Sequence, residues 1–219
     1  MKAFLFDLDG TLTDPREGIT RSIAYALERL GVEPPPADDL VFAIGPPLRS
    51  SLARLLGSAA PETVEKALAH FRERFAEVGI FENRLYDGIV EALDTISAPG
   101  ALLVIATSKP HLYARRIVDH FALGAHFPHV HGCELDGTRA DKRDLIPHIL
   151  SRHGIEADDA VMIGDRGMDM HAARHHGVAA MGVLWGYGSR EELEAHGAQR
   201  LCAVPRDLPA ALARFHAPS

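Results

Sequence analysis

The chain has 219 residues and a formal net charge of −7, and 47% of its residues are hydrophobic. These values suit a globular protein built as one large domain, or as a core domain with a smaller insert. The acidic balance, with an isoelectric point near 6.0, gives no electrostatic reason to expect nucleic acid or an acidic membrane as partner. The two cysteines, Cys133 and Cys202, are too few for a disulfide framework and favour a reducing compartment.

Neither a membrane span nor a secretion signal is expected. The longest apolar run, 101-ALLVIA-106, is far shorter than the roughly 18 residues that a membrane helix needs. Met1 and Lys2 lead directly into a strand-like run, without the apolar region and small-residue cleavage site of a signal peptide. We therefore expect a cytoplasmic protein.

Short apolar runs alternate with helical patterns along most of the chain. The apolar runs are almost continuous, which is typical of strands buried on both faces of a parallel sheet. They lie at 3–6, 101–106, 128–132, 160–163 and 178–185. The helical patterns lie at 89–96, 111–123 and 169–177. This alternation predicts an α/β fold, a Rossmann-like, doubly wound parallel sheet with helices on both faces.

The stretch 15–84 interrupts this alternation, because it shows helix after helix and no convincing strand. Helical patterns lie at 15–30, 48–56 and 62–79. We therefore expect an all-helical domain, 15–84, inserted into a discontinuous α/β core made of 1–14 and 85–219.

The first helix of the insert carries a start signal. Asp14 is expected to be the N-cap, with Pro15 at the first helical position and Glu17 three residues after the cap. Gly31 is expected to end this helix. Asp14 is therefore interpreted as a helix cap and not as a catalytic group.

Polar side chains follow three of the expected strands. Asp7 and Asp9 end the first strand, Thr107 and Ser108 follow the run 101–106, and Asp165 follows the run 160–163. Ligands of parallel sheets gather beyond the carboxyl ends of the strands, so these groups are expected to meet at one edge. The period of two in a strand places Asp7 and Asp9 on the same side of the chain.

These residue types suit phosphoryl-transfer chemistry. Carboxylates from two strand ends form a hard-oxygen site for Mg²⁺, which would offset the repulsion between Asp7 and Asp9. One carboxylate can attack phosphorus to form an aspartyl-phosphate, and the other can protonate the leaving oxygen and then activate water. Thr107, the backbone around Ser108 and one lysine would neutralise the phosphoryl oxygens.

Four ordered segments resemble the sequence motifs of the haloacid dehalogenase superfamily. They are 7-DLDGTL-12, 107-TS-108, Lys142 and 164-GDRGMD-169. The helical insert between the first two segments resembles the small C1-type cap of that superfamily. Further stretches are similar to its phosphoglycolate phosphatase-like subgroup, and 44-IGPPL-48 is most like members described as 5′-nucleotidases.

The resemblance implies roles for individual residues. Asp7 would be the nucleophile and a Mg²⁺ ligand, and Asp9 would be the general acid and base, with its backbone carbonyl on the metal. Thr107 would bind the phosphoryl group and Lys142 would neutralise it. Asp165 would complete the metal site.

Supporting residues also follow from the resemblance. Asp169 would support the site from the fourth motif, and Gly10 and Ser108 would help to bind phosphate. The candidate substrate contacts in the helical insert are Arg16, Gly45, Pro46 and Arg49. The insert is expected to close over the site and to open for product release.

The function implied is that of a Mg²⁺-dependent phosphatase acting on a small phosphate monoester, such as phosphoglycolate or a nucleoside 5′-monophosphate, through an aspartyl-phosphate on Asp7. The presence of Asp9 favours phosphate chemistry over carbon–halogen cleavage. A phosphomutase acting on a sugar phosphate and a non-catalytic binding or regulatory protein are the alternatives. The expected partner is a small phosphorylated metabolite, with no nucleic acid and no membrane, and the sequence leaves a monomer and a homodimer equally open.

Two other patterns are weighed against this function. Cys133 and Arg139 have the spacing of a cysteine-dependent phosphatase loop, but Gly132 stands where a histidine usually precedes the cysteine. The thirteen histidines, among them His129 and His131, are interpreted as scattered, because the sequence places no third ligand for a transition metal.

The reach of Lys142 is the open point of the site. Pro147 follows closely, so the helix that carries Lys142 is expected to kink or to begin late. Lys109 is the nearest rival for the same role. Trp185, in the loop after the last expected strand, is interpreted as a packing residue.

Overall fold

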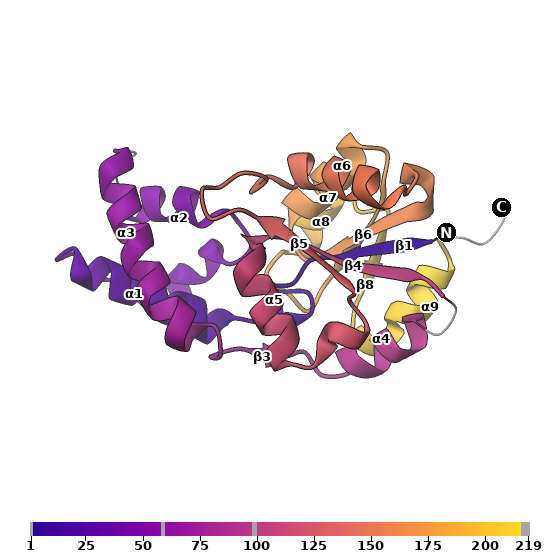
Figure 1. Ribbon diagram of the computed structural model, residues 1–219, viewed down its shortest axis with the longest axis horizontal. Helices are drawn as coiled ribbons and strands as arrows, with labels where there is room; N and C mark the ends of the chain where they lie inside the picture. Colours follow the sequence, from indigo (N-terminus) through magenta and orange to yellow (C-terminus); the bar gives the residue numbers. More distant parts are fainter. Residues whose placement is uncertain (1, 58–59, 98–99, 216–219) are drawn as a thin grey trace. The chain divides into compact units, whose positions relative to one another are not determined.

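The computed structural model describes residues 2–57, 60–97 and 100–215. The chain divides into two compact units, one formed by Met1–Asp14 with Leu85–Ser219 and the other by Pro15–Arg84 (Figure 1).

The first unit is built on a six-stranded sheet in the order β5-β4-β1-β6-β7-β8, in which every neighbouring pair is parallel. The strands are β1 (Ala3–Phe6), β4 (Leu102–Pro110), β5 (His129–Cys133), β6 (Ala160–Gly164), β7 (Ala179–Val183) and β8 (Arg200–Cys202). The chain leaves β1 toward β4 and β5 on one side and later fills the other side from β6 to β8. The doubly wound α/β fold is therefore confirmed, with β1 at its centre.

Helices cover both faces of this sheet, with α6, α7 and α8 on one side and α4, α5 and α9 on the other (Figure 1). The helices are α4 (Ile89–Ser97), α5 (His111–His120), α6 (Lys142–His153), α7 (Gly167–His175), α8 (Arg190–Ala195) and α9 (Leu208–Ala213). Short 3₁₀ turns lie at Leu123–Ala125, Ala157–Asp159 and Pro205–Asp207. The sequence patterns did not predict β8, α8 or α9, which are short.

The central strand is buried at all four positions because both of its faces are covered. Leu5 belongs to a core cluster that also contains Leu145 of α6 and Met170 of α7. On the opposite face, the ring of Phe6 packs edge-on against Phe127, with ring centres 5.6 Å apart. Each such side chain contributes about 1.5–3 kcal/mol of burial free energy, so β1 is held rigidly where the site begins.

Helix α6 begins at Lys142 and continues through Pro147 to His153, so it does not begin late, and the kink expected as the alternative stays a prediction. The Asp141 side chain accepts the Arg143 N–H at 2.8 Å and caps the helix. Pro147 has no N–H to donate to the Arg143 carbonyl one turn earlier. Nε2 of His176 lies 2.6 Å from that oxygen and replaces the missing donor.

The segment after β1 makes a tight turn. The Leu8 carbonyl accepts the N–H groups of Leu12 and Thr13 at 2.9 and 3.0 Å. Gly10 has a φ of +82°, which glycine adopts without strain. Two short strands, β2 (Thr13–Asp14) and β3 (Arg84–Leu85), form a separate two-stranded sheet.

The prediction that Asp14 caps the next helix is wrong. Helix α1 (Arg16–Arg29) has Pro15 at its N-cap and no side-chain cap hydrogen bond. Asp14 lies in β2, and its carboxylate accepts the hydroxyl of Tyr187. A partner distant in sequence therefore takes the carboxylate that the local pattern assigned to the helix.

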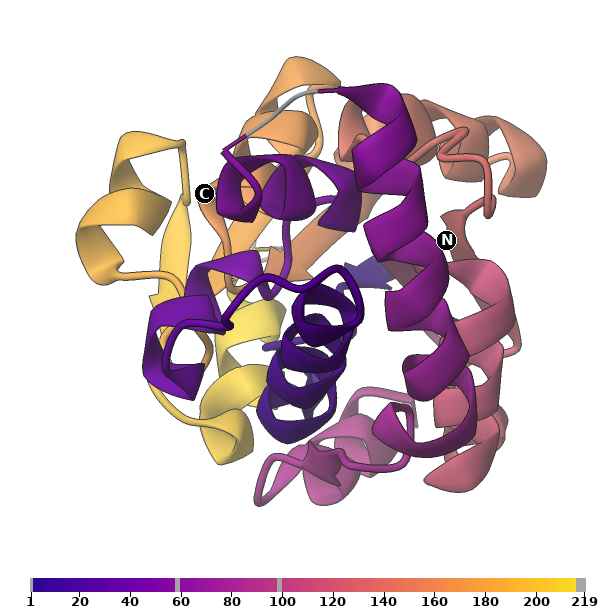
Figure 2. The same cartoon turned by 90° about the vertical axis from the view of Figure 1, so that its left-hand side faces the viewer.

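The second unit is helical, with α1 beside α3 (Figure 2). Its helices are α1, a 3₁₀ segment (Ala37–Ala43), α2 (Leu48–Leu55) and α3 (Pro61–Arg74), which continues as a π-helical turn (Phe75–Gly79). Gly31, with a φ of +73°, follows the end of α1 as predicted. Inside the unit, the Arg74 guanidinium donates two hydrogen bonds to Glu82 at 2.7 and 2.9 Å.

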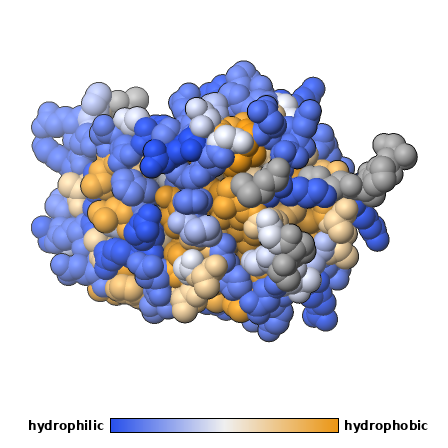
Figure 3. Space-filling view, turned by 45° about the vertical axis from the view of Figure 1, so that its right-hand side comes forward, coloured by the Kyte–Doolittle hydropathy of each residue, from blue (hydrophilic) through white to orange (hydrophobic). Residues whose placement is uncertain are grey.

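Hydrophilic and apolar residues are interspersed on the face shown in Figure 3. Among the described residues, no helix is both long enough and apolar enough to cross a membrane.

Candidate active site

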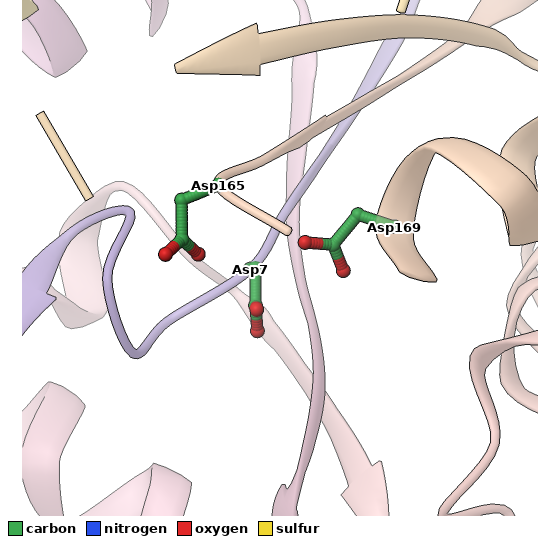
Figure 4. Close-up of side chains that lie close together, drawn as sticks. All are labelled: Asp7, Asp165 and Asp169. Atoms are coloured by element: carbon green, nitrogen blue, oxygen red, sulfur yellow. The ribbon is translucent and has the colours of Figure 1, made fainter. Parts of the chain in front are cut away.

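Three buried carboxylates meet at the carboxyl ends of two neighbouring strands. Asp7 follows β1, Asp165 follows β6, and Asp169 lies in the first turn of α7. One oxygen from each of the three lies within 4.8 Å of the others. Figure 4 shows the three side chains beside one another, each delivered by a different segment. The sheet geometry expected from the sequence therefore brings Asp7 and Asp165 together.

A buried lysine joins two of these carboxylates. Nζ of Lys142 lies 2.9 Å from Oδ2 of Asp7 and also donates to Oδ1 of Asp169. Lys142 is 3% exposed, although it is the first residue of α6. Its early place in the helix gives it the reach that Pro147 had put in question.

The third carboxylate, Asp165, accepts hydrogen bonds from neutral donors. It accepts the Tyr187 N–H at 2.8 Å and the Thr11 hydroxyl at 3.4 Å. Glycines surround it closely, because a Cβ at Gly10 or at Gly186 would overlap the Asp165 side chain. These two positions require glycine for space, and Gly10 requires it for its backbone angle as well.

Asp9 forms an ion pair with a second lysine. Nζ of Lys109 lies 2.8 Å from Oδ2 of Asp9, and both side chains are nearly buried. The other oxygen of Asp9, Oδ1, is buried and has no hydrogen-bond partner. Lys109 and Lys142 thus pair with different aspartates, and which of them would neutralise the phosphoryl group stays a prediction.

Strand β4 brings two hydroxyl groups to the same edge of the sheet. Its pairing with β5 shifts register between Ala106 and Pro110, in the segment that contains Thr107 and Ser108. The Thr107 hydroxyl accepts the Lys109 N–H at 3.2 Å. The Ser108 hydroxyl is buried without a hydrogen-bond partner. A buried donor left open at a strand end is suited to a ligand oxygen.

Burial dominates the electrostatics of the carboxylates. It raises the pKa of Asp165 well above its usual value, and the neighbouring charges of Asp169 and Asp7 add to the shift. Burial also raises the pKa of Asp169 to about 6, although Lys142 opposes this. The pKa of Asp9 is raised by burial, against the opposing charge of Lys109.

The charge of Lys142 is stabilised by the same carboxylates. Burial disfavours its protonated form, but the charges of Asp169 and Asp7 outweigh that effect and raise the pKa of Lys142. The lysine therefore stays cationic in a buried site.

The donor set fits a divalent cation. Asp7, Asp165 and Asp169 bring three negative charges when ionised, and Lys142 supplies one positive charge, so a net charge of −2 remains buried. A divalent ion would offset that excess, and carboxylate oxygens are the ligands that Mg²⁺ prefers. Asp9 contributes no side-chain oxygen to this group, and the expected contact through its backbone carbonyl stays a prediction.

Sequence reasoning missed the contribution of the loop after β7. The indole N–H of Trp185 donates to the Thr11 carbonyl at 2.9 Å, and Tyr187 supports Asp165 through its backbone and Asp14 through its hydroxyl. The run 183-VLWGYG-188 was visible in the sequence, but its bonds to residues near the start of the chain depend on the fold.

The candidate residues of the helical insert lie in the second unit. There Nε of Arg49 lies 2.6 Å from Glu65, and Arg16 pairs with Asp38. Gly45 has a φ of +100°, in the left-handed region, and Pro46 follows it. The roles of these residues in substrate binding stay predictions.

The cysteine loop offers no phosphate cradle. The buried Cys133 thiol donates to the Ser108 carbonyl at 3.0 Å. Arg139, which would have to bind the phosphate, is paired with Glu134.

Comparison with known proteins shows the family of the chain. The family model described as haloacid dehalogenase-like hydrolase matches residues 4–183. A solved structure described as a predicted phosphatase from Clostridium acetobutylicum superposes with a TM-score of 0.93 at 37% identity, covering 97% of this chain and 98% of that one.

The curated relatives include proteins with different names. A 5′-nucleotidase of Pseudomonas aeruginosa is 49% identical over 199 residues, covering 91% of this chain and 90% of that protein. Tyrosine-protein kinase PtkA of Mycobacterium tuberculosis is 37% identical, covering 87% of this chain but 64% of that protein. A phosphoglycolate phosphatase of Agrobacterium fabrum is 30% identical, covering 84% and 80%.

Proposed function

Since this chain belongs to the haloacid dehalogenase-like hydrolases and is a phosphatase of that family, we propose that it hydrolyses small phosphate monoesters through a covalent phosphate on Asp7. The observation that carries the proposal is the position of Asp7, held by Lys142 at 2.9 Å beside Asp165 and Asp169. A carboxylate fixed in this way is oriented for attack, and the lysine neutralises charge that collects on the phosphoryl oxygens.

The first step transfers the phosphoryl group to the enzyme. The Asp7 carboxylate attacks phosphorus, the ester P–O bond breaks, and Asp9 gives its proton to the leaving alcohol oxygen. The raised pKa of Asp9 favours the protonated form that this step needs.

The second step returns the enzyme to its starting state. Asp9, now a carboxylate, takes a proton from water as the water oxygen attacks phosphorus. The bond between phosphorus and Asp7 breaks, and inorganic phosphate leaves. Lys109 lies beside Asp9 in both steps and would stabilise its ionised form.

A divalent ion, which we propose to be Mg²⁺, would be held by Asp7, Asp165 and Asp169. When bound it supplies positive charge to the phosphoryl oxygens. Thr107 and Ser108 would bind the same oxygens from the end of β4.

For the substrate class we propose nucleoside 5′-monophosphates. The support is the relative named 5′-nucleotidase, at 49% identity over nearly the whole of both chains. Phosphoglycolate is the second candidate, because a more distant relative carries that name. Arg16 and Arg49 of the helical unit are the proposed selectors, so alanine at either position should raise KM more than it lowers kcat.

A phosphate-release screen over nucleoside 5′-monophosphates, phosphoglycolate and sugar phosphates tests the proposal. We expect Mg²⁺-dependent release that is fastest with a nucleotide and is lost in Asp7→Asn. A sugar phosphate isomer formed without free phosphate would establish a phosphomutase instead. No turnover of any ester would favour a non-catalytic protein.

Because one relative is named tyrosine-protein kinase PtkA, the screen should include an assay of phosphate transfer to tyrosine. That relative is 37% identical, and an aspartyl-phosphate could pass its phosphate to a tyrosine hydroxyl as well as to water. Incubation with ATP and a tyrosine peptide should yield no phosphopeptide if hydrolysis is the function. Phosphopeptide formation that depends on Asp7 would overturn the proposal.

A further inference from the structure

Four histidines from two neighbouring elements lie together on the first unit. His129 and His131 come from β5, the edge strand of the sheet, and His148 and His153 come from α6. All four are half-buried. The interpretation of the histidines as scattered is therefore wrong for this group, which we call the imidazole cluster.

The cluster arises from the packing of α6 against β4 and β5. Residues two apart in a strand share a face, so His129 and His131 point to the same side of the sheet. The ring of His129 stacks on His153, with ring centres 4.2 Å apart and a tilt of 38°. The rings of His153 and His148 lie 5.1 and 5.7 Å from that of His131.

Two nitrogens in the cluster face each other directly. Nε2 of His131 and Nε2 of His153 lie 2.8 Å apart. Only one proton fits between them, so at least one ring presents a lone pair. Burial, together with the charges of His153 and His148, lowers the pKa of His131 to about 4, so that ring is neutral at pH 7. Neutral imidazole is the form that binds metal ions.

The spacing matches the coordination of a tetrahedral ion. With metal–nitrogen bonds of about 2.0–2.1 Å, two imidazoles on one Zn²⁺ have nitrogens about 3.3 Å apart and ring centres about 5.2 Å apart. The observed values for His131 and His153 are 2.8 and 5.1 Å. The pair would need to open by only about 0.5 Å to admit an ion.

We propose that His131 and His153 bind a divalent transition-metal ion such as Zn²⁺ or Cu²⁺, with water completing its coordination. His129 is too close to His153 to share the ion with it, and it serves instead to orient the His153 ring. Nitrogen ligands select Zn²⁺ and Cu²⁺ over Mg²⁺, so this site and the carboxylate site take different metals. The bound ion would tie α6 to the edge strand.

Titration of the metal-free protein in excess Mg²⁺ tests the proposal, because Mg²⁺ occupies the carboxylates. Calorimetry with Zn²⁺ should give one ion per chain with a Kd at or below about 10 μM. At a hundredfold excess over that Kd, Zn²⁺ should raise Tm by about 5 °C or more. The electron paramagnetic resonance spectrum of bound Cu²⁺ should show splitting from nitrogen ligands.

Two variants decide whether the imidazole cluster is responsible. His131→Gln with His153→Gln should abolish binding, and His153→Gln alone should weaken it at least about 10-fold. The matched control, His171→Gln with His175→Gln, removes two exposed histidines from one face of α7 and should bind as the native chain does. Far-UV circular dichroism and Mg²⁺-dependent phosphate release report whether each variant is folded.

Other outcomes would overturn the proposal. Equal Zn²⁺ affinity in the native chain and a folded His153→Gln variant would show that the cluster binds nothing. Loss of binding in the α7 control, or a Cu²⁺ spectrum without nitrogen splitting, would place the ion elsewhere. Absence of Zn²⁺ binding by the native chain would mean that His131 and His153 are only a hydrogen-bonded pair.

Discussion

The first unit contains two groups of titratable side chains on the same sheet, the carboxylates beyond β1 and β6 and the imidazole cluster of β5 and α6. The two groups differ in how the fold compensates for the burial of their charge. The carboxylate group is buried, and Lys142 offsets part of its negative charge from beside Asp7 and Asp169. The imidazole cluster is half-buried, and burial lowers the pKa of His131 to about 4, so that ring is neutral at pH 7. At the end of β1, where the proposed chemistry needs charge, the carboxylates lie beside an opposite charge. In the edge strand, His131 is neutral instead.

The largest expected effect comes from removing the proposed nucleophile. Asp7→Asn leaves a side chain of the same shape that cannot form the covalent phosphate, so kcat for phosphate release should fall on the order of 10⁴-fold or more. If Asp7→Asn still released phosphate at the native rate, Asp7 would not be the nucleophile, and the proposed difference between the two groups would be wrong. The double variant of His131 and His153 is the control, and its activity with Mg²⁺ should be unchanged.

Removal of the proposed Mg²⁺ should affect phosphate release through the carboxylate group. Dialysis against a chelator should lower phosphate release at least about 10³-fold, because the buried carboxylates lose the charge that offsets them. Added Mg²⁺ should restore activity in the native chain but not in Asp165→Asn. Restoration in that variant at ordinary Mg²⁺ concentrations would exclude Asp165 as a ligand.

Loss of the lysine should affect both activity and stability. Lys142→Ala leaves Asp7 and Asp169 buried without their cation, so kcat should fall about 10²–10³-fold. The free energy of unfolding without Mg²⁺ should fall by about 3–5 kcal/mol. Urea denaturation measures the second effect, and Lys142→Arg, which keeps the charge but changes the donor geometry, should recover more stability than activity.

The imidazole cluster should make stability depend on pH between about 4 and 6.5. The pKa of His131 is lowered to about 4 in the folded chain, so the unfolded chain binds more protons in this range. Stability should therefore be complete above pH 6.5 and should fall as the pH drops toward 4. Because the ring is half-exposed and screened by solvent, this contribution is on the order of 1 kcal/mol.

Urea denaturation at pH 7.5 and 5 measures this dependence. The difference between the two pH values should be smaller in His131→Gln than in the native chain. Subtracting the variant removes the contribution of carboxylates that titrate in the same range. Identical differences in the two proteins would show that His131 is not neutralised by the fold.

The smallest effect is expected at the bond between Tyr187 and Asp14. Tyr187→Phe removes the hydroxyl but keeps the backbone N–H that supports Asp165, so stability should fall by about 1 kcal/mol with little change in kcat. A double-mutant cycle with Asp14→Asn should give a coupling energy of similar size. Additive effects would mean that the bond contributes nothing.

The parts of the site that follow from local pattern were predictable. The rule that ligands gather at the carboxyl ends of parallel strands predicts that Asp7 and Asp165 lie at one edge of the sheet. The sequence also singled out Lys142 by its order among the motifs. The capping hydrogen bond to Asp141 then explains why Lys142 sits at the start of α6.

The parts that depend on packing between distant segments were not predictable. The capping pattern around Asp14 was sound as local chemistry, but Tyr187, 173 residues away, takes the carboxylate. The imidazole cluster likewise needs the contact between α6 and β5, and nothing in the spacing of His131 and His153 reveals it. Pro147 misled for the same reason, because the donor that replaces its missing N–H, His176, lies beyond the helix.

The central position of β1 has a consequence for how the protein is made. Leu5 is paired with Val104 on one side and with Met162 on the other, so the first strand to leave the ribosome is flanked by strands that are synthesised much later. Contacts so distant in sequence make folding slow. The nascent chain therefore holds Asp7 beside an unfinished sheet until β6 arrives, and β6 leads directly to Asp165. Synthesis and assembly of the carboxylate group are thereby coupled, and a ribosome stalled before residue 160 would display an apolar β1 with one side unpaired, a natural target for chaperones.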